Sequence, residues 1–458
     1  MSNRLLCISY RFPPETYALA IRVKYFLNHL RREGWEINAV TAAPEAVSRD
    51  GLTVHHVPPR TPDRLLEWAR SLQLGKLIDW VVWPDPYVFW VLSAYQKARQ
   101  LLRDGQYDGV VVFMMPHSTG LVGLLLRRET ELPLVLNMND SLTCSDMNPE
   151  YPSKLHYRLA KNLEDTYVQS ADAVIYVSKR NLERVRDRQP PEHRDKFHLI
   201  RRGTNSPPAL EPSLRDREEF RIGYVGGTGG WYRFLENERS HSLPKRLYRA
   251  WKQLGRYSHA DLDYRTHGPV YLGQAVKRVI DEHPAWAGRL HVDVYGKRFP
   301  ESVTDAVLDK FGLQDIVHLH GPVPHEEALQ KMAESDLLFM ALPDRLDGSA
   351  GGRISAKTYE YLMTDRPILA ALPPGENREY LEDKPGVHLV DPAGVEEMTE
   401  VVARLASDQF DSTPISIDRT ALHSSLSSTA RAQAFERVVS EVFTGDSAAR
   451  DVLAAADT

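Results

Sequence analysis

Cysteine is the scarcest residue in this 458-residue chain, which contains only Cys7 and Cys144. Two cysteines exclude a fold held by several disulfides, and they exclude a zinc or iron–sulfur site built from clustered thiolates. So few thiols are typical of a reducing compartment, and we predict a cytoplasmic protein.

An excess of charge of one sign is also missing. Lys and Arg total 57 and Asp and Glu total 62, which gives a formal net charge of −5 at pH 7. A dedicated nucleic-acid binder carries a broad basic surface, so nucleic acid is not an expected partner.

Long hydrophobic runs are rare. The apolar stretch 5–8 is shorter than the core of a secretory signal, which needs about 7–15 residues. The uncharged run 109–126 raises the question of a membrane span, but Pro116 and Gly120 divide it into a strand, a loop and a helix start. We predict a soluble protein; peripheral association with the inner face of a membrane stays open, because 84–92 is apolar apart from Asp85.

Several catalytic signatures are absent. The sequence contains no H-E-x-x-H, no G-x-S-x-G and no paired cysteines, and its 17 histidines are scattered. Metalloprotease, α/β-hydrolase and structural zinc functions therefore have no support, and we predict no metal site. The G-x-G-x-x-G and P-loop signatures are not matched either, which disfavours NAD and ATP as ligands.

Short apolar runs alternate with helical patterns along most of the chain, whose length predicts two or three domains. Continuous apolar runs are typical of strands covered on both faces, and their alternation with helices predicts doubly wound parallel sheets. The fold class is therefore α/β, with two Rossmann-like domains. The expected strands are 4–10, 36–41, 53–57, 110–115, 133–138 and 173–178 in the first domain, and 220–225, 290–295, 316–320, 337–341, 367–371 and 387–390 in the second.

The domain boundaries follow from composition. A Pro-, Ser- and charge-rich stretch, 203–219, reads as a linker. We predict an N-terminal Rossmann-like domain at 1–205, a C-terminal Rossmann-like domain at 206–415, and a helical segment with a frayed tail at 416–458 that packs back on the first domain. Ligand crevices of such sheets lie at the carboxyl ends of the strands, so a central cleft between the two domains is the expected site.

The segment 347–362 is the most informative motif. It follows a predicted strand, contains Gly351 and Gly352, and enters a helix that carries Arg353, Lys357 and Glu360. Glycine amides, a helix start and two cationic side chains favour a phosphate group, whereas the carboxylate suits sugar hydroxyls beyond it. A surface helix preceded by a Gly-rich turn explains the same residues about as well.

Two further turns at strand ends favour an anion. Gly226 and Gly227 open a run that also contains Gly229 and Gly230, and Lys297 follows the next predicted strand. A flexible connection is the alternative for the glycine run. Three such turns in one domain support a diphosphate site better than any one of them.

In the first domain, Glu15, His117 and Asp140 all follow predicted strands. Their common position predicts that they meet on the crevice side of one sheet. Taken singly, each is as well explained by a turn or by a helix cap.

Short segments spread from residue 1 to about 405 carry a family likeness. In order and spacing they resemble the retaining glycosyltransferase family 4 group, whose fold is called GT-B. The matching segments are 12–15 with Arg22, 34–41, 132–140, 170–178, 295–296, 317–323, 333–336 and 357–368.

The resemblance implies transfer of a sugar from a nucleotide-diphosphate donor to a glycan, lipid-linked or small-molecule acceptor, as in polysaccharide biosynthesis. It implies retention at the anomeric carbon, no cofactor and no essential metal, the nucleotide sugar being a substrate. Glu360 is similar to the family's ribose ligand, the second Glu of an E-x7-E motif. Arg353 and Lys357 would lie near the diphosphate, in the nucleotide-sugar domain 206–415. Glu15, His117 and Asp140 would lie on the sugar or acceptor side, in the domain 1–205.

Three departures from the family pattern limit the resemblance. Gly352 stands where the first Glu of the E-x7-E motif falls, and Gly226 to Trp231 replace the usual Arg and Lys after the first strand of the second domain. In the N-terminal loop, Glu15 to Ala18 stand where many relatives carry glycines. A catalytically degenerate GT-B protein that binds a nucleotide or a glycan, or acts as an assembly partner, is therefore the alternative hypothesis. An NAD-dependent oxidoreductase is a weaker one.

Overall fold

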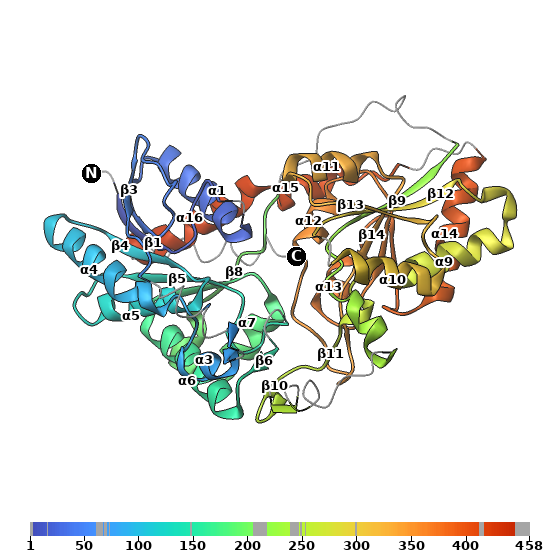
Figure 1. Cartoon of the computed structure of the whole chain (residues 1–458). Coiled ribbons are helices and arrows are strands. Elements are labelled where there is room, and N and C mark those ends of the chain that lie inside the picture. Colours follow the sequence, from blue (N-terminus) through green and yellow to red (C-terminus); the bar gives the residue numbers. More distant parts are fainter. Residues whose placement is uncertain are drawn as a thin grey trace. The chain divides into compact units, whose positions relative to one another are not determined.

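The computed structural model describes residues 3–444 apart from 16, 61–66, 68–70, 73, 147–148, 205–217, 239–246, 248–249, 252, 298–299 and 412–415. The chain forms two compact units (Figure 1). Unit 1 comprises Met1–Gly203, Ala250–His259 and Ser428–Thr458, and unit 2 comprises Thr204–Arg249 and Ala260–Ser427.

Unit 1 is built on a seven-stranded sheet with the order β3-β2-β1-β4-β5-β7-β8, in which all neighbours pair in parallel. Alternate residues of the central strands face opposite sides: Leu6 packs into one hydrophobic cluster and Leu5 into another. The strands are β1 (Arg4–Ser9), β2 (Glu36–Thr41), β3 (Leu52–His56), β4 (Gly109–Phe113), β5 (Leu134–Asn139), β7 (Ala173–Tyr176) and β8 (Phe197–Leu199).

Helices cover both faces of this sheet. One face packs against α4, α5, α6 and α7, the other against α1 and α16, where the rings of Phe26 and Phe435 stack with centroids 4.1 Å apart. The helices are α1 (Ala18–Arg32), α3 (Gly75–Val81), α4 (Val88–Asp104), η1 (His117–Thr119), α5 (Gly120–Arg127), α6 (Lys154–Ser170), α7 (Lys179–Arg186), η2 (Pro191–Lys196) and α16 (Ser428–Thr444).

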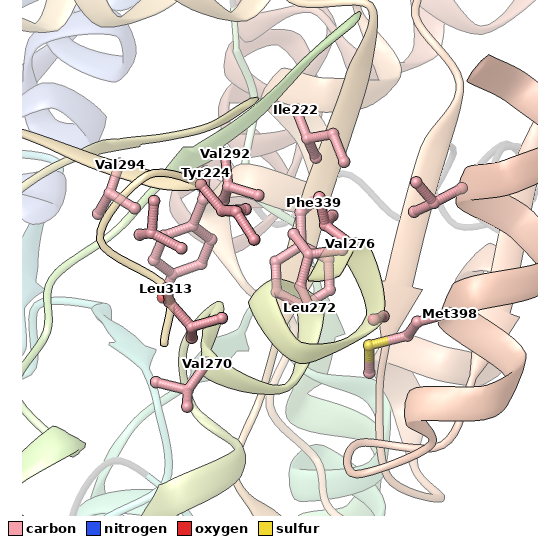
Figure 2. Packing of buried hydrophobic residues seen from close by; sticks show 14 of the residues in the cluster. Ile222, Tyr224, Val270, Leu272, Val276, Val292, Val294, Leu313, Phe339 and Met398 are labelled. Carbon is pink, nitrogen blue, oxygen red and sulfur yellow. The ribbon is translucent and has the colours of Figure 1, made fainter. Parts of the chain in front are cut away.

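Unit 2 has a six-stranded parallel sheet with the order β13-β12-β9-β14-β16-β17. On one face, Leu272 and Val276 of one helix and Met398 of another pack near Ile222 and Phe339 of the sheet (Figure 2). The strands are β9 (Phe220–Val225), β12 (Leu290–Tyr295), β13 (Val317–Gly321), β14 (Leu337–Ala341), β16 (Ile368–Ala371) and β17 (Val387–Val390).

The helices of unit 2 again lie on both faces, with α9, α10 and α14 on the face shown in Figure 2. They are η4 (Trp231–Glu238), η5 (Tyr264–Thr266), α9 (Val270–Glu282), η6 (Pro284–Trp286), α10 (Glu301–Phe311), α11 (His325–Glu334), α12 (Ala356–Leu362), α13 (Glu376–Leu381), α14 (Val395–Phe410) and α15 (Thr420–Leu426). The predicted α/β class with two doubly wound parallel sheets is confirmed.

The chain passes between the units more often than the predicted domains imply. A segment between β9 and α9 belongs to unit 1, where β10 (Tyr257–Ser258) pairs with β6 (Glu150–Tyr151) in antiparallel orientation. In unit 2, β11 (Leu262–Asp263) pairs with β15 (Asp344–Arg345).

The last part of the chain is divided as well. The predicted segment 416–458 does not form one block, because α15 belongs to unit 2 and α16 to unit 1. Most of the predicted linker and tail lies outside the described residues. Among the helices that the structure describes, none has the length and hydrophobicity to cross a membrane.

Candidate functional site

The three predicted anion-binding turns of unit 2 lie at one edge of its sheet. They follow β9, β12 and β14, and β9 lies between the other two strands. Because parallel strands end at the same edge, this order brings the turns together.

The turns after β9 and β12 are bonded to each other. The amide of Gly226 donates to the carbonyl of Tyr295 at 2.8 Å, and the amide of Thr228 donates to the carbonyl of Lys297 at 3.2 Å. A Cβ on Gly296 would lie 2.4 Å from the Gly226 oxygen, so glycine there permits a close backbone approach. The Gly226 amide is thus already paired within unit 2, and Gly227 and the exposed Lys297 lie beside it.

The turn after β14 is held in a similar way. The amide of Gly351 donates to the carbonyl of Pro374 at 3.2 Å, and the Gly351 carbonyl accepts from the amide of Glu376 at 2.9 Å. Since the Gly351 amide is paired, the prediction that it binds a phosphate needs correction. The helix that follows, α12, has only seven residues, so the cationic side chains and Gly352 remain the candidate phosphate ligands.

Lys357 lies in an environment that opposes its charge. Its ammonium is 5.2 Å from the centroid of the Tyr224 ring. Burial and the positive charge of Arg353 lower the pKa of Lys357 to about 8, despite the opposing effect of Glu360. Two cations held together in a partly buried place would be stabilised by a bound anion.

The carboxylate of Glu360 is mostly buried, with 17% of its side chain exposed, and its Oε1 lies 3.9 Å from Nε2 of His325. It is one helical turn from Lys357, so a diphosphate next to the lysine would leave the carboxylate near the nucleoside.

Three residues of this edge have no counterpart in the sequence-based prediction. The hydroxyl of Tyr224 and the indole nitrogen of Trp231 are buried and have no hydrogen-bond partner among the described residues. His267, which precedes α9, has a pKa lowered to about 3 by burial and by the charges of Arg353 and Lys357. Buried polar groups normally find partners, so the unpaired Tyr224 hydroxyl, whose ring lies beside Lys357, favours a polar ligand at this edge.

In unit 1, the predicted residues also follow adjacent strands. Glu15 comes after β1, His117 after β4 and Asp140 after β5, and these strands are neighbours in the sheet. Glu15 is paired with Arg11, with its Oε2 3.4 Å from the guanidinium. Asp140 lies 3.8 Å from the guanidinium of Arg202.

His117 is the most distinctive of the three. Its main-chain oxygen accepts from the hydroxyl of Tyr167 at 2.9 Å, and its buried Nδ1 has no hydrogen-bond partner among the described residues. Burial lowers the pKa of His117, although the charges of Asp85, Glu164 and Asp140 oppose this. The ring is therefore neutral at pH 7, so it can both accept and donate a hydrogen bond.

Asp85 was not expected from the sequence, because its partner is far along the chain. Its carboxylate accepts from the amide of Ser118 at 2.9 Å and from the Ser118 hydroxyl at 2.7 Å. Asp85 and His117 together line a pocket of about 320 Å³ within unit 1, whose walls also include Trp83, Leu142 and Tyr151. Asp140 and Glu15 are not among the residues of this pocket.

A buried ion pair supports the loop after β5. The Glu164 carboxylate accepts from the Leu142 amide at 2.8 Å and from the Thr143 hydroxyl at 2.6 Å, and Arg188 lies 2.7 Å from it. Burial alone would raise the pKa of Glu164, but Arg188 and these hydrogen bonds outweigh it and lower the value. Within the described part of the chain, no three His, Cys, Asp or Glu side chains gather as a metal site.

Residues 18–203 match a protein family described as a glycosyl transferase 4-like domain. No curated protein matches the sequence. Three solved structures share the fold over nearly the whole chain at low identity.

The first is sucrose-phosphate synthase from Thermosynechococcus elongatus, with 14% identity, a TM-score of 0.60, and 97% of this chain and 100% of that chain covered. The second is a UDP-forming trehalose-phosphate synthase from Burkholderia vietnamiensis, with 13% identity, a TM-score of 0.59, and coverages of 100% and 99%. The third is Anabaena HepE in complex with UDP-glucose, with 15% identity, a TM-score of 0.52, and coverages of 94% and 99%. The resemblance to GT-B-fold glycosyltransferases is confirmed.

Proposed function

We propose that the protein is a glycosyltransferase that moves a sugar from a nucleotide-diphosphate donor to an acceptor. The observation that carries the proposal is the cationic cluster of unit 2, in which Lys357 has a pKa near 8 beside Arg353. The fold shared with a structure that contains UDP-glucose supports a nucleotide sugar as the donor.

In this proposal, unit 2 binds the donor. Lys357 and Arg353 stabilise the negative charge that develops on the diphosphate as it leaves, aided by Gly352, Gly227 and Lys297. Glu360 accepts hydrogen bonds from the ribose hydroxyls.

Unit 1 binds the acceptor in the pocket beside His117, with Asp140 and Glu15 at the same edge of the sheet. The unpaired Nδ1 of His117 is available to a sugar or acceptor hydroxyl. We propose retention by front-face attack: the acceptor oxygen bonds to the anomeric carbon as the bond to the phosphate oxygen breaks, and the acceptor proton passes to that phosphate. The reaction as proposed needs no resident cofactor or metal. We also propose that the protein is located in the cytoplasm and acts in the assembly of a glycan.

The proposal is tested by incubating the protein with UDP-, GDP- and ADP-sugars and measuring the released nucleotide. We expect release with one donor, and a roughly 10- to 100-fold weaker nucleotide affinity in Lys357→Ala, because a hydrogen bond to a charged group is lost. Lys277→Ala, which removes an exposed lysine of the same unit, is the matched control. Glu360→Ala should also weaken binding of the nucleotide.

His117→Asn should leave nucleotide affinity unchanged and lower turnover by roughly 100-fold, since its contact would be to the reacting sugar or acceptor. Absence of release, together with absence of a thermal shift by any nucleotide, contradicts the transferase proposal. A thermal shift without release supports the alternative, a degenerate binding protein, which Gly352 in place of a glutamate favours.

A further inference from the structure

The structure places exposed apolar side chains of three separate segments on one part of unit 1. They come from α3, from the first turns of α6 and from residues 251 and 254. Leu254 is 69% exposed, Leu155 59% and Leu77 52%. Trp80, Leu159 and Trp251 are also exposed, and we call these six residues the apolar surface.

Contacts show that the three segments that carry the apolar surface lie next to one another. The ammonium of Lys76 on α3 donates to the carbonyls of Trp251 and Leu254, each at 2.5 Å. In the ring of His156 on α6, Nδ1 lies 2.8 Å from the hydroxyl of the N-cap Ser153 and Nε2 lies 3.0 Å from the carbonyl of Trp80. Leu159 is one helical turn beyond His156, so the exposed leucines of α6 and residues 251 and 254 each lie near α3.

Positive charge borders this surface. Lys154, Arg158 and Lys161 are exposed and form a stripe along α6 next to the stripe of Leu155 and Leu159. The nearby acidic side chains do not balance it: Glu150 is paired with Arg256 at 2.5 Å, which leaves Asp79 as the acidic residue on α3.

We propose that the apolar surface docks on a bilayer that contains anionic phospholipid. Leucine and tryptophan side chains would enter the boundary between headgroups and acyl chains, and the lysine and arginine stripe would contact the anionic headgroups. Tryptophan suits this depth because its ring is apolar and its N–H is polar. A protein partner would not require leucine and tryptophan to lie next to Lys154 and Lys161, which have no ion-pair partner among the described residues.

The two helices that carry most of the apolar surface also contribute to the pocket of unit 1. Lys76 of α3 and His156 of α6 line the pocket that contains His117. An acceptor held in the bilayer would therefore lie close to this pocket when the apolar surface is docked. This consequence rests on the proposed function, whereas membrane binding itself does not.

Flotation with vesicles tests the docking proposal without measuring activity. We expect the full chain to bind vesicles of phosphatidylcholine mixed with phosphatidylglycerol, and to bind phosphatidylcholine alone much more weakly. K154E/R158E/K161E should weaken binding to the mixed vesicles by roughly 100-fold. L155Q/L159Q/L254Q should weaken it by at least about tenfold, because apolar area no longer enters the lipid.

Control variants carry changes of the same kind elsewhere on unit 1. V47Q alters an exposed apolar residue, and K24E/R32E/R128E alters the net charge equally; both should bind as the unchanged protein does. Unchanged thermal melting of each variant shows that it is folded. Failure of the unchanged protein to bind the mixed vesicles overturns the proposal, and so does equal loss in variants and controls. Self-association that the leucine variant abolishes, without vesicle binding, would assign the surface to a second copy of the chain instead.

Discussion

Single residues define the chemistry of unit 2, and Lys357 is the clearest example. Burial and the positive charge of Arg353 destabilise its protonated form, which lowers its pKa to about 8. A diphosphate would offset this destabilisation, because its charge lies close to both cations. Burial, together with the charges of Arg353 and Lys357, lowers the pKa of His267 to about 3, so the imidazole is neutral and can accept a hydrogen bond from a nucleotide hydroxyl or a sugar hydroxyl.

Nucleotide diphosphate binding should therefore depend on pH. Lys357 is protonated below pH 8 and loses its proton above that value, so the affinity should fall as pH rises, by up to about tenfold per pH unit. Binding between pH 8 and 9 should also take up a proton, which calorimetry in buffers of different ionisation enthalpy measures.

Lys357→Met is the control for this prediction, because it removes the titrating group but keeps the titration of the nucleotide itself. Its affinity should be weak and nearly independent of pH over the same interval. An affinity of the unchanged protein that stays constant from pH 7 to 10 would contradict the assignment of Lys357 to the diphosphate.

At the scale of elements, α6 and the loop after β5 depend on one buried carboxylate. Glu164 is fully buried, and Arg188 is the cation beside it. A buried charge that loses its partner is strongly destabilising, whereas the intact pair contributes little by itself.

Arg188→Met should lower the free energy of unfolding by about 3–5 kcal/mol at pH 7, as measured by urea denaturation. In this variant the pKa of Glu164 should rise, because burial is then no longer opposed by the guanidinium. A carboxyl whose pKa is raised in the folded state becomes neutral as pH falls, so the deficit should be smaller at pH 5 than at pH 7. Arg186→Met, which changes an exposed arginine close by, should have little effect; a deficit that is equal at both pH values would exclude this role for Glu164.

The elements were largely predictable from the sequence, because continuous apolar runs mark strands such as β4 and β14 wherever helices cover both faces. The ends of the strands were also predictable, and with them the position of His117 after β4 and of the Gly-rich turn before Lys357. The pairing of the Gly226 and Gly351 amides could not, since it depends on which strands become neighbours. Asp85 was missed for the same reason: its partner Ser118 is brought to it only by the tertiary fold.

At the scale of the whole molecule, the chain joins its two units at four places, namely 203–204, 249–250, 259–260 and 427–428. No single cut therefore separates two complete domains. The core of unit 1 includes Phe435, Val438 and Val439 from the end of the chain, all fully buried against residues such as Phe26 of α1. The predicted domain 1–205 consequently lacks one of the helices that cover its sheet.

A fragment of residues 1–203 should for this reason be unstable, although a sequence-based domain boundary suggests that it folds alone. Without α16, one face of α1 and the sheet beneath it would be exposed to solvent. Loss of the Phe435 side chain alone should lower the free energy of unfolding by about 3–5 kcal/mol. Fusing 428–458 to the fragment through a flexible linker should restore a cooperative thermal transition by circular dichroism, and Phe435→Ala in the fusion should abolish the gain. Gln433→Ala, on the exposed face of the same helix, should keep it. If the unfused fragment showed a cooperative transition at the same temperature as the fusion, α16 would not stabilise the core of unit 1. The continuous domain 1–205 that the sequence predicts would then be the folding unit.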